Sequence, residues 1–523
     1  MHEDRAMPGE TLVQVLDGAS TIGGTKIAMH LASDKTILLD FGWNFRVDHD
    51  FLDGFMKLRK SNMLWDGMCI GELPAAMDRL AGLYREDLLH YCFEEVESRF
   101  GSIPGEPKHV TDVLVSHAHA DHLGNIRCLH PNVRVVCTRP TRLVIDHLDE
   151  MAQGSLYFND IISFEPMFQR EYNQRHGVKR AGASKRTRIS RPFAILDDGE
   201  TLDCGGGGCR ARPVPVDHSI PGASAWLVED TRTGTRVVYT GDFRFHGPRG
   251  NDTEAFIEAA RAFTPDVLII EGTRLHPDGN RDEVQSEKEI EDQLATILGA
   301  TAPGKLACFD CSPRDAWRLR SFYKAATSAG KTLVLDAKSH DLLDRCVKAH
   351  IIPDVDMRDI RIYLPKKGWG TYEDVDYSNS KAIRQASMLH GDSMLPAAEI
   401  AAEPGAHVVY LPYYSMVELF DLQPPSGSVY VISKSEPFND EGLIEERKRT
   451  NWLRLFGFES GDVHHVHCSG HARRDDLAVA INTIAPRMVI PVHTEHPEEF
   501  KVIGIDAGIR IELPVNGQVF PLR

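Results

Sequence analysis

The sequence predicts an α/β fold made of more than one domain. Short apolar segments of the kind that form buried strands recur along the chain, and several end directly in histidine or aspartate. Between residues 271 and 465, such segments alternate with stretches whose apolar residues recur at helical spacing. At roughly 150 residues per domain, a chain of 523 residues is expected to hold about two to four of them.

Composition and charge are those of a folded globular protein, with 42% hydrophobic and 26% charged residues. No apolar run reaches the ~20 residues that span a bilayer, and the first ten residues lack the pattern of a signal peptide. We therefore expect a cytoplasmic protein with no membrane partner and with cysteines present as thiols. The net charge of −17 disfavours a surface coated in phosphate-binding cations. A local basic groove stays compatible with it, because nucleic-acid affinity depends on charges at the contact.

The first feature with evident chemistry is VSHAHADHLG, at residues 115–124. It follows an apolar segment that predicts a short buried strand, and ADHLGN predicts the turn into a helix. Alternate side chains of an extended segment point the same way, so His117 and His119 can bind one ion from one side. Asp121 and His122 lie beyond them and can reach a second ion. Imidazole and carboxylate groups suit zinc or a similar divalent metal, whereas a polar turn with chance histidines is a poor explanation of this spacing.

The H-x-H-x-D-H pattern after an apolar strand resembles the metallo-β-lactamase superfamily. The resemblance implies an αββα sandwich with a metal centre at its edge, and it implies further ligands downstream. Four segments match the remaining motifs in order, each at the end of an apolar strand: KTILLDFG with Asp40, RPVPVDHS with His218, RVVYTGDF with Asp242 and PRMVIPVHTEH with His493.

The same resemblance assigns roles to these residues. His117, His119 and His218 are expected to hold one ion, and Asp121, His122 and His493 the other. Asp242 is expected to bridge the two ions, and Asp40 to orient neighbouring ligands. The implied cofactors are two Zn²⁺ per chain, with Mn²⁺ as an alternative. Two such ions ~3.5–4 Å apart form a clamp that hydrolyses phosphodiesters or amides.

About 250 positions separate Asp242 from His493, and this interval has an α/β pattern of its own. A lactamase core with such an insert resembles the β-CASP nucleases, nearest to ribonuclease J and its archaeal-style relatives. The expected division is 1–270 for the lactamase core, 271–465 for the inserted β-CASP domain and 466–523 for the return to the core. Within this interval, strands are expected from PDVLIIEGT, GKTLVLDAKS, HVVYLPYY and GSVYVIS, and helices from SEKEIEDQLATILGA and RDAWRLRSFYKAATSAG.

The β-CASP resemblance also implies the catalytic residues. Glu271 in IIEGT, His471 in VHCSGHARRDDL and His493 match its motifs A, B and C. His471 is expected to protonate the leaving 3′-oxygen, oriented by Glu271. His467, Ser469 and His471 are expected to hold substrate phosphate, and a hydroxyl, a glycine and two imidazoles suit an oxyanion on chemical grounds. For His467, an ordinary core histidine is the alternative.

The function that follows is a zinc-dependent ribonuclease that hydrolyses single-stranded RNA by a two-metal mechanism, as a 5′-exonuclease, an endonuclease or both. In the family, histidine at the position of His493 accompanies RNA substrates. A DNA nuclease of the same fold is the main alternative. A non-catalytic subunit of an RNA-processing complex is disfavoured because all seven expected ligands are present.

Other expectations concern assembly and two surplus segments. The oligomeric state stays open: a homodimer is one candidate, although the usual C-terminal dimer-supporting domain of the family is not expected in the 30 residues after His493. An additional segment at about 50–100 predicts helices and could be a lid, an interface or, in the favoured interpretation, added cover. A basic stretch at 170–191 could contact nucleic acid or be a solvated loop. Its candidate RNA contacts are Arg180, Lys185, Arg186 and Arg188.

Overall fold

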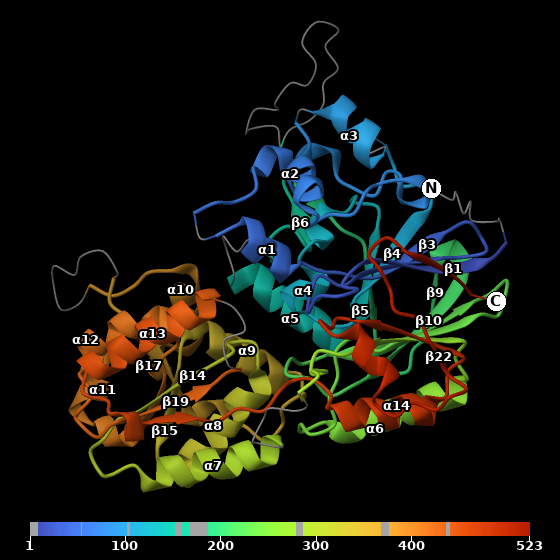
Figure 1. Cartoon of the computed structure of the whole chain (residues 1–523). Coiled ribbons are helices and arrows are strands. Elements are labelled where there is room, and N and C mark those ends of the chain that lie inside the picture. Colours follow the sequence, from blue (N-terminus) through green and yellow to red (C-terminus); the bar gives the residue numbers. More distant parts are fainter. Residues whose placement is uncertain are drawn as a thin grey trace, which may run out of the picture.

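The computed structural model of the chain describes residues 9–53, 55–90, 92–101, 105–151, 158–167, 187–278, 286–367, 376–435 and 440–522. Within these residues, three seven-stranded sheets form the framework (Figure 1). No helix in the described ranges combines the length and the apolar character that crossing a bilayer requires.

Two of the sheets face each other across a shared apolar core. The first has the strand order β23 (Val519–Leu522), β1 (Thr11–Asp17), β2 (Lys26–His30), β3 (Thr36–Phe41), β4 (Val110–Leu114), β5 (Arg134–Thr138) and β8 (Phe193–Leu196). The second has the order β22 (Arg510–Ile511), β21 (Met488–Val492), β13 (Val267–Glu271), β12 (Arg236–Tyr239), β11 (Ser224–Asp230), β10 (Cys209–Pro215) and β9 (Leu202–Cys204). One buried cluster contains side chains of both sheets, among them Leu39 and Ile269.

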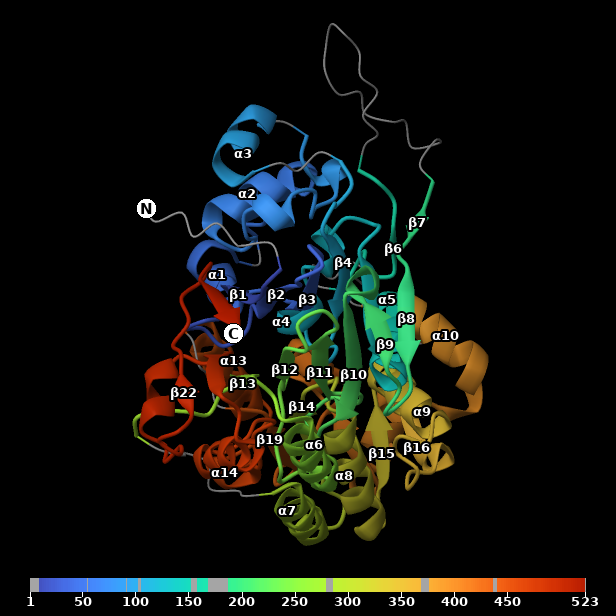
Figure 2. The same ribbon diagram turned by 90° about the vertical axis from the view of Figure 1, so that its right-hand side faces the viewer.

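Helices cover the outer face of each sheet. On the second sheet, α6 (Gly250–Phe263) and α14 (Arg474–Ile484) bury Phe256 and Ile481 against Leu268. On the first, α2 (Met63–Ile70) and α5 (Arg139–Met151) contribute to the cluster that holds Val113 and Val135. Both views place α6 and α14 on the opposite side of the sandwich from α2 (Figures 1 and 2). The layers are therefore α, β, β and α, which confirms the predicted fold class.

The third sheet is parallel throughout. Its order is β17 (Met394–Pro396), β16 (Ile360–Leu364), β15 (Thr332–Leu335), β18 (His407–Tyr410), β14 (Ala307–Cys311), β19 (Val429–Ser433) and β20 (Val463–His465). Successive residues of β14 face opposite sides, with Phe309 in one apolar cluster and Cys308 in another. The helices around this sheet are α7 (Glu287–Ala300), α8 (Ala316–Ser328), α9 (Ala337–Lys348), α10 (Lys381–His390), α11 (Ala397–Ala402), α12 (Leu419–Leu422) and α13 (Asp440–Leu455).

The strands of the third sheet lie between residues 307 and 465, while β13 and β21, which flank them in the sequence, are paired neighbours in the second sheet. The chain therefore leaves the sandwich after one strand and returns to pair beside that strand. On this basis we propose the division 1–270, 271–465 and 466–523. Figure 1 shows the yellow and orange unit beside the body formed by the blue, green and red parts.

The additional segment at 50–100 is less helical than its sequence suggests. After α1 (Phe45–Phe51) it contains α2, α3 (Phe93–Phe100) and three turns of 3₁₀ helix, and its other described residues form no further helix or strand. Gly71 ends α2 in the left-handed conformation with φ of 85°, and Pro74 follows it closely. These two residues limit α2 to about two turns.

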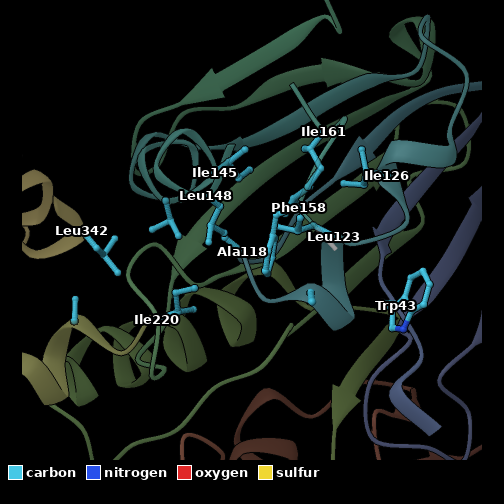
Figure 3. Close-up of a cluster of buried hydrophobic side chains, with 14 of the residues drawn as sticks. Trp43, Ala118, Leu123, Ile126, Ile145, Leu148, Phe158, Ile161, Ile220 and Leu342 are labelled. Carbon is cyan, nitrogen blue, oxygen red and sulfur yellow. The ribbon is translucent and has the colours of Figure 1, made fainter. Parts of the chain in front are cut away.

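A continuous apolar cluster joins the third sheet's helices to the lactamase-like sandwich. Leu342 of α9 lies with Ile145 and Leu148 of α5 in one buried cluster, and Figure 3 shows these side chains in the same region. Polar pairs flank the contact between α5 and α9. His147 Nδ1 lies 2.7 Å from Asp341 Oδ2.

Replacing Leu342 with alanine should lower the stability of the protein. The side chain is fully buried, so the loss of apolar contacts and the remaining cavity are expected to cost about 2–5 kcal/mol. Chemical unfolding would show this as a lower midpoint for Leu342→Ala. Met388→Ala on α10 is the control, because Met388 is exposed and its truncation should leave the midpoint unchanged. Equal midpoints for both variants and the wild type would contradict a contribution of this contact.

Candidate metal centre

The candidate ligands follow the carboxyl ends of strands. Asp242 comes three residues after β12, Glu271 is the last residue of β13, and His493 directly follows β21. These three strands are parallel neighbours, so their carboxyl ends meet at one edge of the second sheet. From the facing sheet, β4 leads into His117, and the short helix α4 (Ala120–Leu123) carries Asp121 and His122.

The structure brings all seven sequence-predicted ligands together with Glu271 and His471. Three groups of side chains have ligand atoms within 4.8 Å of one another. They are His117, His119, His218 and Asp242; then Asp121, His122, Asp242 and His493; and finally Asp242, Glu271, His471 and His493. Asp242 belongs to every group, and it is 2% exposed.

In the first group three imidazole nitrogens converge. His119 Nδ1 lies 3.1 Å from His117 Nε2 and 3.2 Å from His218 Nε2. His218 Nδ1 is 2.6 Å from the carbonyl oxygen of Gly470, so this nitrogen donates and Nε2 keeps its lone pair for the group. Burial, followed by neighbouring histidines, holds the pKa values of His117 and His119 well below their usual range. The neutral rings that result are the form that binds metal.

The second group pairs imidazoles with carboxylates. His122 Nε2 lies 3.1 Å from Asp242 Oδ2, and His493 Nε2 lies 3.1 Å from Asp121 Oδ2. Behind His122, Asp40 Oδ2 accepts a hydrogen bond from Nδ1 at 2.8 Å. The Nε2 atom of a neutral His122 would therefore present a lone pair to a carboxylate, an arrangement that requires positive charge between them.

The residues present fit a bound divalent metal. Asp242 Oδ1 is buried and accepts no hydrogen bond within the described part of the chain. Burial would lower the pKa of His122, but Asp242 and Asp121 outweigh it and raise this pKa well above its usual range. The site thus favours positive charge at its centre. Imidazole nitrogens and carboxylate oxygens converging on that point are the ligand set of zinc and similar metals.

Glu271 holds His471 at the edge of the group. His471 Nδ1 lies 3.0 and 3.2 Å from the two carboxylate oxygens of Glu271. The carboxylate is itself fixed, because it accepts from the backbone N–H groups of Phe243 at 3.1 Å and Thr273 at 3.0 Å. Burial would lower the pKa of His471, but Glu271 and Asp242 more than offset it and raise the pKa to about 8.

The loop from His467 to His471 lies against the first group of ligands. A Cβ atom on Gly470 would come within 3.2 Å of His218 Cε1, so the close approach favours glycine here. Ser469 Oγ accepts from the backbone N–H of His471 at 3.2 Å. His467 Nδ1 lies 3.5 Å from the buried Arg318, and burial followed by Arg318 lowers the pKa of His467 to about 3.

Three side chains that support the ligands were given no role by the sequence. Thr273 Oγ1 lies 2.8 Å from His493 Nδ1, and the hydroxyls of Ser116 and Tyr239 each donate to Asp40 Oδ2 at 2.6 Å. The only sequence signal is their position within two or three residues of a predicted ligand or strand end.

The candidate RNA contacts are placed only in part. Arg180, Lys185 and Arg186 lie outside the described residues. Arg188 is exposed, and its Nε donates to Ser163 Oγ at 2.6 Å. It precedes β7 (Ile189–Ser190), which pairs with β6 (Ser163–Phe164).

Comparison with known proteins agrees with this geometry. Residues 96–298 match the family described as beta-lactamase superfamily domain, and residues 460–501 match the Zn-dependent metallo-hydrolase RNA specificity domain. Ribonuclease J of Sinorhizobium meliloti is 24% identical over 76% of this chain, which spans 60% of that relative's length. Ribonuclease J of Pyrococcus abyssi is 22% identical over 86% of this chain and 91% of its own length.

A solved structure shares the fold over nearly the whole chain. The crystal structure of a protein of unknown function from Enterococcus faecalis V583 matches with a TM-score of 0.71 and 23% identity, over 98% of this chain and 100% of that one. The sandwich and the family matches show a protein of the metallo-β-lactamase superfamily, and the ligand groups support metal binding at the edge of its sheets. Within that superfamily, the chain belongs to the β-CASP family and is ribonuclease J-like.

Removing metal should destabilise the folded protein, because any ion that binds only the folded state stabilises it. An ion present at 100 times its dissociation constant contributes about 2.7 kcal/mol per site. Thermal unfolding after dialysis against a chelator should therefore begin at lower temperature, and added Zn²⁺ or Mn²⁺ should reverse the shift. Asp242→Ala should respond much less to added metal. An unfolding curve of the wild type that chelator and metal leave unchanged would argue against a metal centre here.

Proposed function

We propose that this protein is a metal-dependent ribonuclease that hydrolyses the phosphodiester bonds of single-stranded RNA with a pair of zinc ions, for which Mn²⁺ is an alternative. The observation that carries the proposal is the convergence of the seven ligands beside the His471–Glu271 pair. Support for RNA comes from the match of residues 460–501 to an RNA specificity domain and from relatives named ribonuclease J.

His117, His119 and His218 are proposed to hold one ion, and Asp121, His122 and His493 the other. Asp242, the member common to both groups, would bridge them. Asp40 and Thr273 would fix the ring orientations of His122 and His493 through their Nδ1 atoms. When bound, the ions supply an activated water and stabilise negative charge on the phosphoryl oxygens.

His471 is the proposed general acid. Its Nδ1 is held by Glu271, so Nε2 is the nitrogen left to carry a proton to the leaving 3′-oxygen. Because Glu271 is buried and fixed by two backbone N–H groups, it can orient the ring without moving. Asp242 Oδ2 lies 3.9 Å from His471 Nδ1, a distance that supports a proton donor next to the proposed bridging ligand.

The loop that carries His471 is proposed to hold the substrate phosphate through Ser469 and His471. The carbonyl oxygen of Ser469 accepts from Arg244 at 3.2 Å and from His246 at 2.9 Å, and these two hydrogen bonds fix the backbone of the loop. His467 is the weaker member of the predicted trio, because its contact with Arg318 gives it a structural partner. Arg188 and the basic residues before it stay candidate RNA contacts.

A DNA nuclease of the same fold is the alternative. Parallel assays with labelled single-stranded RNA and DNA of the same sequence would separate the two, and preferential cleavage of DNA would overturn the choice of RNA. RNA labelled at either end would then distinguish 5′-exonuclease action, which yields mononucleotides from one end, from endonuclease action, which yields internal fragments. A non-catalytic subunit would cleave neither substrate.

His119→Ala and Asp121→Ala should each reduce RNA cleavage to the level of a reaction without enzyme. Each variant removes a ligand from a different group, so metal content should also fall in both. Elemental analysis of the purified proteins checks the second expectation. His465→Ala is the matched control, because this histidine is exposed on β20 and outside the ligand groups. Undiminished cleavage by either ligand variant would refute the assignment.

His471→Ala should separate proton transfer from metal binding. Loss of a general acid typically slows a reaction about 10²–10⁴-fold, and the metal content should stay at the wild-type level. Glu271→Gln should slow cleavage in the same direction, by a smaller factor. If metal is lost from His471→Ala, then His471 is a ligand of the third group and not the acid. Turnover under saturating RNA is the quantity to compare.

A further inference from the structure

The additional segment at 50–100 places a buried carboxylate beneath the metal centre. Glu72 lies two residues after the end of α2, and its side chain is only 1% exposed. Its Oε1 accepts from the backbone N–H of Asn44 at 3.0 Å and from Asn125 Nδ2 at 2.5 Å. Both partners belong to the lactamase-like sandwich. Burying a carboxyl group lowers the stability of the fold unless hydrogen bonds or ion pairs compensate for the lost contact with water.

One arm of contacts leads from Glu72 to Asp121. Asn125 Nδ2 also donates to the carbonyl oxygen of Gly42 at 2.8 Å. The backbone N–H of Trp43, the next residue, donates to the carbonyl oxygen of Ala120 at 2.9 Å. The turn at Gly42 packs so closely on Asp121 that a Cβ atom there would lie 1.6 Å from the Asp121 carbonyl oxygen. Glu72 therefore clamps this turn against the helix that carries two ligands.

A second arm leads from Glu72 to His493. Lys26 Nζ, which is fully buried, lies 3.9 Å from Glu72 Oε1 and donates to Asp17 Oδ2 at 2.9 Å. Asp17 Oδ1 accepts from the backbone N–H of Gly18 at 2.9 Å, and the carbonyl oxygen of Gly18 accepts from the backbone N–H of His493 at 2.8 Å. The buried charges thus fix the backbone of a third ligand.

Both arms end in the second group of ligands. None of the hydrogen bonds and ion pairs described for Glu72, Lys26 and Asp17 reaches His117, His119 or His218. Burial raises the pKa of Glu72 to about 7, although Lys26 opposes the shift. A neutral side chain with the same acceptor oxygen is therefore a close substitute for Glu72 in this position.

We infer that Glu72 is a positioning residue for the ion held by Asp121, His122 and His493, and that the additional segment is an integral part of the second metal site. The inference rests on the proposed pair of metals. It replaces the interpretation of the segment as added cover, because cover alone would require no buried acid in contact with the ligand-bearing turns.

Metal stoichiometry and affinity test the inference. Glu72→Leu fills the same space without an acceptor, and it should weaken binding of one ion about 10–100-fold while the other ion is retained. After gel filtration, elemental analysis should find about two Zn²⁺ per chain in the wild type and about one in Glu72→Leu. Glu72→Gln keeps the acceptor oxygen and should restore the wild-type value. Competition with a chromogenic chelator measures the two affinities directly.

Two further variants separate positioning from general damage to the segment. Tyr84→Phe removes a partly buried hydrogen bond from the Tyr84 hydroxyl to the carbonyl oxygen of Pro74 within the same segment, and it should keep both ions. If Glu72→Leu does not fold, Asn125→Ala is the second test. It removes the hydrogen bonds from Asn125 to Glu72 and to Gly42, and the protein should lose the same ion. Retention of both ions with wild-type affinity in a folded variant of either kind would overturn the inference alone. A wild type that binds only one ion would overturn the paired-metal proposal, and the inference with it.

Discussion

The buried carboxylate of Asp242 is the constraint around which the rest of the structure is arranged. An ionised carboxylate removed from water is unstable unless cations or hydrogen-bond donors surround it. Here one oxygen accepts no hydrogen bond among the described residues, and the other faces His122. Burial holds the pKa values of His117 and His119 well below their usual range, whereas Asp242 and Asp121 raise the pKa of His122 well above its own, so the centre favours positive charge beside this carboxylate. The fold thus creates an electrostatic requirement that a metal centre satisfies.

Sequence reasoning found the ligands because each lies within a few residues of the end of an apolar strand. The strands at Val110–Leu114, Arg236–Tyr239 and Met488–Val492 occur where the apolar segments predict them, and side chains at adjoining strand ends must come together. Thr273 and Tyr239 could not be given their roles in this way, because one hydroxyl in a strand or turn forms no pattern. The role of Glu72 could not be predicted from the sequence either, because its hydrogen-bond partners Asn44 and Asn125 lie 28 and 53 residues away along the chain.

The loop of His467 is the place where the motif left two interpretations open, a phosphate contact and an ordinary core histidine. Sequence reasoning grouped His467 with Ser469 and His471, but Arg318 of α8 lies beside it. Arg318 is one member of a buried ionic chain in which Glu287 of α7 contacts both Arg318 and Arg244, at 2.7 and 2.8 Å. Arg244 also pairs with Asp217 at 3.1 Å, next to the ligand His218. Helices of the third sheet and a ligand of the sandwich are thereby held in one charged array.

The position of the insert follows from the pairing of β13 with β21. Adjacent parallel strands need a long crossover, because the chain must travel from the carboxyl end of one to the amino end of the next. The crossover here starts at Glu271, on the edge where the ligands gather, so whatever is inserted there must border the metal centre. The returning chain reaches the same edge at His471 before α14 carries it back to the start of β21. A domain that borders the centre and a histidine that returns to it are therefore two consequences of one strand pairing.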